Sequence, residues 1–270
     1  MGGVFRNIAI TGAGIAVLYW LVGLYDTALR DPRFFDGWIL LAGIAVQLAF
    51  HFRKRRPESR AGQVSSWMTI HIYAGYFVIA AFLVHTDFSM PDSLFEWSLW
   101  TLFVLVTLSG VVGAYLTRSI PGKLEQGAAR VTLESIPAMR FKLAGEVDAL
   151  ALDSVDTVGS QAISEFYVDR LRGYFRRPRN LLAHLRGSHR PLTRIFNDIN
   201  NLERYVGEPG KDTLETIKGL VVAKNNLDIQ YAHQGLLQTW LFLHIPATYC
   251  LIVLSVLHVA IVYAYSSGAP

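Results

Sequence analysis

Five long runs of mostly uncharged, apolar residues constrain this chain more than any other feature. They lie at about 7–25, 37–52, 67–86, 95–116 and 237–265, and the second is the shortest. A helix of about 20 apolar residues crosses the hydrocarbon core of a bilayer. With 52% hydrophobic and only 17% charged residues, the chain is also more apolar than an ordinary soluble domain. The sequence therefore predicts an all-α integral membrane protein with about five transmembrane helices in a bundle.

The positions of Lys and Arg predict how these helices are oriented. The loop after the second run carries five basic residues within 53–60, whereas the loop after the third run, 86–97, contains Asp87, Asp92 and Glu96 and no Lys or Arg. Positively charged loops stay on the cytoplasmic side of a membrane. We therefore expect a multi-pass protein of a bacterial-type inner (plasma) membrane, with its N-terminus in the cytoplasm and its C-terminus outside.

The long connection between the fourth and fifth runs predicts a cytoplasmic insertion that is mostly helical. The expected domains are 1–116, with the first four helices, 117–236, the insertion, and 237–270, the fifth helix and C-terminal tail. The insertion shows short alternating segments up to about Ser160 and a helical pattern after it. From about Asp212 this pattern contains no proline up to Trp240, which predicts one long helix leading into the fifth run.

Eight arginines lie between residues 170 and 194 of the insertion. A basic stretch beside a membrane favours contact with lipid headgroups. Docking of an acidic redox partner is a second interpretation, and we expect no nucleic-acid binding because the stretch is poor in aromatic residues. We find no catalytic triad and no pair of carboxylates with catalytic spacing in this domain.

Two apolar segments share one histidine pattern, HIYAGYFVIAAFLVH at 71–85 and HIPATYCLIVLSVLH at 244–258. Fourteen residues of helix rise about 21 Å and fall about 40° short of four full turns, so both histidines of a segment lie on one face. The two helices are two spans apart and run in the same direction. We therefore expect His71 to meet His244 at the cytoplasmic level and His85 to meet His258 at the outer level.

Histidines in the hydrocarbon region are costly and usually line a functional interior. Two neutral imidazoles that approach from opposite sides suit the axial positions of a haem iron. A zinc ion fits less well, because two ligands leave its tetrahedral coordination half complete. The alternative is a haem-free membrane assembly or proton- and ion-handling protein whose histidines are packing or proton-carrying groups. Cys250 is the single cysteine, so any haem is held non-covalently.

The H-x13-H pattern on two parallel helices resembles the di-haem b-type cytochromes. These include the cytochrome b of quinol-oxidising complexes, the transmembrane ferric reductases, and the cytochrome b subunits of membrane-bound hydrogenases and formate dehydrogenases. The resemblance covers the last three runs and the ligand set, whereas the insertion of about 120 residues is not part of the family pattern. It implies one b-type haem on His71 and His244 and a second on His85 and His258.

By the same resemblance the chain transfers electrons across the membrane as a subunit of a larger oxidoreductase, rather than as a self-sufficient enzyme. Membrane lipid and redox protein subunits are its expected partners. A quinone is a further candidate ligand, and a quinone-linked role is favoured over metal reduction.

A few other residues are candidates for contact with such haems. Gly75, one turn after His71, offers a side-chain-free surface for a porphyrin, and Arg118 and Arg53 at cytoplasmic helix ends are candidates for haem propionates or simple determinants of topology. His51 and His233 are candidates for a quinone contact, an alternative ligand or, as we favour, an interfacial side chain. We expect His184 and His189, in the basic loop, to be solvated.

Overall fold

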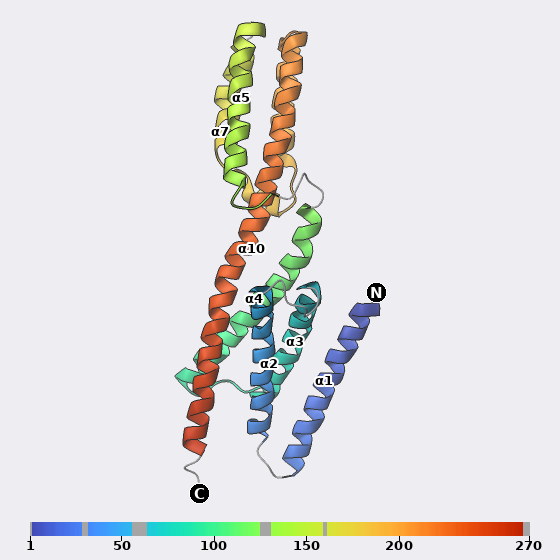
Figure 1. The fold of residues 1–270 in the computed structure, drawn as a ribbon, viewed down its shortest axis with the longest axis vertical. Helices are drawn as coiled ribbons and strands as arrows, with labels where there is room; N and C mark the ends of the chain where they lie inside the picture. Colours follow the sequence, from blue (N-terminus) through green and yellow to red (C-terminus); the bar gives the residue numbers. More distant parts are fainter. Residues whose placement is uncertain (1, 29–31, 56–63, 125–130, 159–160, 267–270) are drawn as a thin grey trace. The chain divides into compact units, whose positions relative to one another are not determined.

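The protein is described here from a computed structural model covering residues 2–28, 32–55, 64–124, 131–158 and 161–266 (Figure 1). These residues form helices and turns, with no strand among them, as the sequence predicted. Two compact units divide the chain. Unit 1 comprises Met1–Ala114 and Leu241–Pro270, and unit 2 comprises Tyr115–Trp240. The predicted boundaries at 116 and 236 lie near these divisions.

Unit 1 contains the apolar helices. They are α1 (Gly2–Thr27), α2 (Arg33–Arg55), α3 (Val64–His85), most of α4 (Leu94–Leu124) and the C-terminal part of α10 (Glu208–Ser266). Among the described residues, four helices are long and apolar enough to cross a membrane, namely those at 2–27, 66–85, 94–120 and 208–265. These long apolar helices are compatible with a multi-pass membrane protein. The second predicted run falls within α2, whose side chains beyond residue 49 lie outside the described part, so the count of five spans stays a prediction.

Close packing of α2 along α3 depends on a glycine. A Cβ atom at Gly43 would lie 2.6 Å from Cγ2 of Val78, so a larger residue would push the two helices apart. A small apolar core, Ile44, Val78, Phe103 and Leu251, joins these helices to α4 and α10. Many large apolar side chains of unit 1 are instead exposed, including Phe5 (76%) and Leu105 (54%). Such a surface suits lipid rather than water.

Unit 2 is built from shorter helices around the N-terminal part of α10. They are α5 (Ile136–Val158), α6 (Gln161–Phe166), the π-helix η1 (Tyr167–Leu171), α7 (Arg172–Arg176), α8 (Leu181–Leu185), α9 (Arg190–Leu202) and the 3₁₀ turn η2 (Glu203–Tyr205). The prediction of short alternating segments before Ser160 was wrong, because this stretch forms α5. Leu143, Val147 and Ala151 recur every four residues and place one helix face against the core. The long helix predicted from about Asp212 is confirmed, since α10 begins at Glu208 and continues to Ser266.

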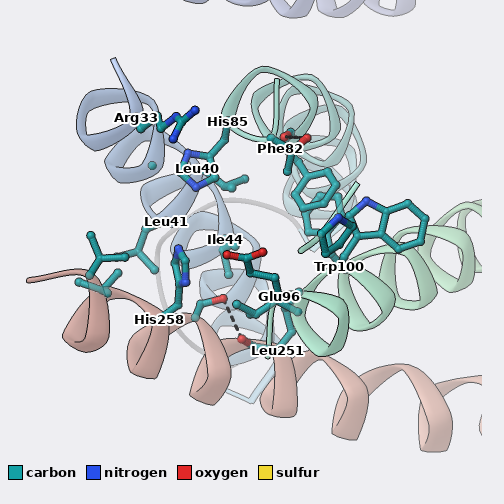
Figure 2. Close-up of a pocket in the computed structure, with 18 of the residues that line it drawn as sticks. Arg33, Leu40, Leu41, Ile44, Phe82, His85, Glu96, Trp100, Leu251 and His258 are labelled. Carbon is teal, nitrogen blue, oxygen red and sulfur yellow. Dashed lines mark hydrogen bonds between the residues drawn. The ribbon is translucent and has the colours of Figure 1, made fainter. Parts of the chain in front are cut away.

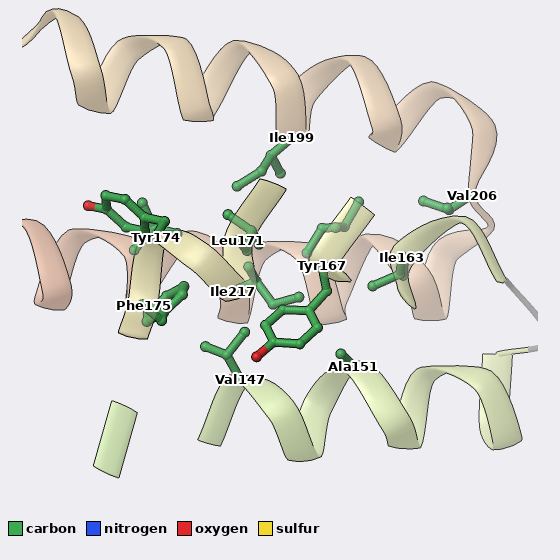
Figure 3. Close-up of a cluster of buried hydrophobic side chains, with 12 residues drawn as sticks. Val147, Ala151, Ile163, Tyr167, Leu171, Tyr174, Phe175, Ile199, Val206 and Ile217 are labelled. Atoms are coloured by element: carbon green, nitrogen blue, oxygen red, sulfur yellow. The ribbon is translucent and has the colours of Figure 1, made fainter. Parts of the chain in front are cut away.

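The core of unit 2 is continuous and well packed. Figure 3 shows Val147 and Ala151 of α5 on one side of the cluster and Ile199 of α9 on the other, with Phe175 between the helices. Phe175 and Ile199 are completely buried. Burial of this apolar surface stabilises the unit in water.

Charged groups inside unit 2 are paired. Lys224 and Asp228, both 0% exposed, are in contact, and the Lys224 ammonium lies 3.8 Å from the centre of the Tyr174 ring. The expectation that His184 is solvated was wrong, because it is 3% exposed within α8, and burial lowers its pKa from the usual 6.5. His233 is also buried, with Nδ1 2.9 Å from the Ile229 carbonyl oxygen, and so is not the interfacial side chain we favoured.

Candidate functional site

Two cavities in unit 1 each contain one of the expected histidine pairs. The larger, of about 510 Å³, is lined by His85 and His258, and the smaller, of about 130 Å³, by His71 and His244. The first histidine of α3 thus shares a cavity with the first of α10, and the second with the second. This arrangement requires α3 and α10 to run in the same direction, as the two helices do in Figure 1.

In the larger cavity the two imidazoles lie close to each other. His85 reaches the cavity from α3 and His258 from α10 (Figure 2), with their ring centres 6.4 Å apart and their planes at 89°. Two imidazoles on opposite sides of one ion have ring centres about 6 Å apart when each metal–nitrogen bond is about 2 Å. The distance between the ring centres is therefore close to that expected for two imidazoles on one ion.

A buried carboxylate orients His85. Nδ1 of His85 lies 2.7 Å from Oδ1 of Asp36, which is 2% exposed in the first turn of α2. The next residue is Gly37, where a Cβ atom would lie 3.0 Å from Cε1 of the same ring, so a side chain there would displace the imidazole. With Nδ1 directed at the carboxylate, Nε2 is the nitrogen that can bind a metal.

Asp36 and Gly37 were not among the predicted site residues. The sequence signal was present, because Asp36 is the only acidic residue between positions 32 and 52. This carboxylate comes from α2, whereas the predicted histidine pattern concerned only the two helices that carry His85 and His258.

In the smaller cavity His244 has a neutral partner from α4. Its Nδ1 lies 2.6 Å from Oγ of Ser109, and this hydroxyl donates to the Val106 carbonyl oxygen at 2.8 Å. Because the hydroxyl donates its proton to this carbonyl oxygen, Oγ accepts a hydrogen bond from the Nδ1–H of His244. His244 therefore also presents Nε2 as its metal-binding nitrogen. Ser109 was not predicted.

The other predicted site residues have different positions. Gly75 lines the smaller cavity, where a Cβ atom would lie 3.0 Å from Nε2 of Gln47. Arg118 is exposed and belongs to unit 2, and the side chains of Arg53 and His51 lie outside the described residues. An arginine we did not predict, Arg33, lines the larger cavity.

The two cavities differ in how well they suit a porphyrin. Sites for ligands of this kind usually measure about 300–1,000 Å³. The larger cavity falls within that range and has both axial donors, so its residues fit a haem. The smaller cavity has an equivalent donor set but is below the range, so its lining side chains would have to move apart to admit one.

Comparisons of the chain with known protein families, with curated proteins and with solved structures found no match. In the part of the chain that the structure describes, no three His, Cys, Asp or Glu residues lie together as a metal site. A haem iron needs only two axial ligands from the protein, because the porphyrin supplies the other four. The description of the candidate site therefore depends on its geometry alone, which is one pair of histidines in each of two cavities.

Proposed function

We propose that the chain is a di-haem b-type cytochrome that transfers electrons across a membrane, as a subunit of a larger oxidoreductase. The observation that carries this proposal is the sorting of four histidines into two pairs, each in its own cavity and each made by the same two helices. A structural histidine needs only a hydrogen-bond partner and has no reason to repeat at one spacing on two helices.

Each protein group has a defined part in this proposal. His85 and His258 hold one haem iron, and His71 and His244 hold the other. Asp36 accepts a hydrogen bond from Nδ1–H of His85, and Ser109 accepts one from Nδ1–H of His244. Each bond fixes the tautomer of its ring and leaves Nε2 for the iron. When bound, the haems supply the one-electron redox chemistry.

Several finer expectations belong to the same proposal. Gly75 gives a porphyrin access to α3, and Arg118 and Arg53 are candidates for propionate contacts, to which Arg33 is added because it lines the larger cavity. The N-terminus and unit 2 lie in the cytoplasm, the membrane is a bacterial-type inner membrane, and the arginine-rich stretch contacts lipid headgroups or a redox partner. A quinone is the favoured small-molecule electron carrier.

A reduced-minus-oxidised visible spectrum of the detergent-purified chain, with haem quantified per polypeptide, tests the proposal. We expect two b-type haems in the wild type and one in each of His71→Ala and His85→Ala, with a different haem lost from each variant. His189→Ala, an exposed histidine of unit 2, is the matched control and keeps both. A well-folded wild-type sample in native lipid without haem would contradict the proposal.

A second candidate function is haem-free proton handling, favoured by one observation. The contact between half-buried His85 and buried Asp36, 2.7 Å apart, is an arrangement that also carries protons in membrane pumps and transporters. The same spectrum separates the two functions, because a proton-handling protein contains no haem. In that case we expect proton uptake into proteoliposomes to be lost in Asp36→Asn and retained in Glu96→Gln.

A further inference from the structure

We propose that Asp36 is a positioning residue that gives the haem of the larger cavity a lower midpoint potential than its unassisted histidines would. This inference rests on the proposed function, since it concerns the haem that His85 would hold. It arises from a difference between the two cavities. One ligand histidine is backed by a carboxylate and the other by a hydroxyl.

The contact between Asp36 and His85 is built into the fold rather than formed at the surface. Asp36 is 2% exposed, and the His85 ring is held against it over Gly37. Asp36 also lies in the first turn of α2, where the helix dipole stabilises a negative charge. The Asp36 carboxyl group is therefore held close to Nδ1 of His85 by the fold.

A carboxylate that accepts a hydrogen bond from Nδ1–H makes the imidazole a stronger electron donor at Nε2. Stronger donation stabilises ferric iron over ferrous iron, and the nearby negative charge acts in the same direction. Ser109 accepts the same kind of hydrogen bond from His244 without a charge. Hydrogen bonds to charged acceptors are roughly twice as strong as neutral ones, so the electronic effect is concentrated at the larger cavity.

Asp36 lies behind His85 and does not line the larger cavity, whereas three charged side chains do line it and have to be separated from this effect. Arg33, Asp92 and Glu96 are all exposed. Glu96 accepts hydrogen bonds from the backbone amides of Asp92 at 3.0 Å and Ser93 at 3.4 Å, so it caps the start of α4. Solvent screens exposed charges more than buried ones, and Asp36 is the buried acid that contacts a ligand histidine.

The test is a potentiometric titration of the detergent-purified full chain, with both haems quantified in every variant. Asp36→Asn keeps an acceptor oxygen near Nδ1 but removes the charge. We expect this variant to retain two haems. The midpoint potential of the larger-cavity haem should rise by about 59 mV, which is a tenfold change in the equilibrium constant for reduction by one electron. The His71→Ala variant, which would keep only that haem, assigns the potential.

Two further variants serve as matched controls. Glu96→Gln removes an acidic charge from the same cavity without touching His85 and keeps an oxygen for the helix cap, so we expect a clearly smaller shift. Ser109→Ala removes the neutral acceptor at His244, and we expect any change to be confined to the smaller-cavity haem.

Each outcome has a definite meaning. An unchanged potential in Asp36→Asn, or an equal shift in Glu96→Gln, would overturn the inference and leave the proposed function intact. Loss of the larger-cavity haem from Asp36→Asn would also overturn it, because Asp36 would then serve to retain the haem rather than to lower its potential. Absence of haem from the wild type would instead overturn the proposed function itself.

Discussion

The two units solve the problem of burying polar groups in opposite ways. In unit 2, the apolar side chains form a continuous core, and the buried charges of Lys224 and Asp228 contact each other. In unit 1, the buried core is small, the outward surface is apolar, and the polar side chains gather around two cavities. The difference teaches that unit 2 places its apolar side chains in a core, whereas unit 1 leaves many of them exposed and encloses two cavities.

The comparison also shows how each unit treats its histidines. His184 and His233 in unit 2 are buried among packed helices. The four histidines of α3 and α10 line open space. The two histidines of unit 2 are thus buried, whereas the four of α3 and α10 are half-buried beside a cavity.

The largest expected effect sharpens the description of unit 2 as a packed core. Phe175→Ala should lower the free energy of unfolding of this unit by about 3–5 kcal/mol, because it opens a cavity at a fully buried site. Hydrogen exchange of the α5 and α9 amides in the full chain measures the loss. Phe141→Ala in α5, at a site 84% exposed, is the control and should change stability by less than about 0.5 kcal/mol. Equal effects would mean that unit 2 also packs through its outer face.

A somewhat smaller effect tests whether the exposed surface of unit 1 faces lipid. Leu105→Asp, near the middle of the apolar part of α4, should raise the free energy of inserting this helix by about 3 kcal/mol. Glycosylation reporters placed on either side of α4 measure insertion. Leu182→Asp is the matched control, because Leu182 is 70% exposed in unit 2 and should tolerate the charge in water. If both variants behave alike, the exposed leucines of the two units face the same solvent.

The smallest effect concerns the pH dependence of unit 2. Burial lowers the pKa of His184 from 6.5, so the unfolded chain takes up a proton before the folded unit does as the pH falls below 6.5. Protonation therefore favours unfolding, and stability should decline with acidification in this range. Denaturant titrations at several pH values should show a shallower decline in His184→Gln, whereas His189→Gln, at an exposed site, should keep the wild-type slope. If the slope is unchanged in His184→Gln, a group other than His184 causes the pH dependence of the stability of unit 2.

Local rules were sufficient for much of the fold. Apolar runs predicted α1, α3, α4 and the end of α10, and the absence of proline predicted the long helix before it. They were insufficient for α5, because the even spacing of Leu143 and Val147 also fits the alternation of apolar and polar residues in a strand. They were also insufficient for His184. The arginines around His184 favoured the prediction that it is solvated. Its burial results from the packing of α8 within unit 2, which the local sequence does not show.

The sequence by itself determined the spacing of the histidine pairs. The rise and rotation of a helix are local properties, so His71 with His85 and His244 with His258 had to share a face. Only the tertiary structure decided which side chain accepts the Nδ1 hydrogen bond of a ring and how large the cavity beside the ring is. Asp36 is 49 residues from His85, and Ser109 is 135 residues from His244. No local pattern specifies such a partner, because its position depends on how α2 and α4 pack beside the histidine-bearing helices.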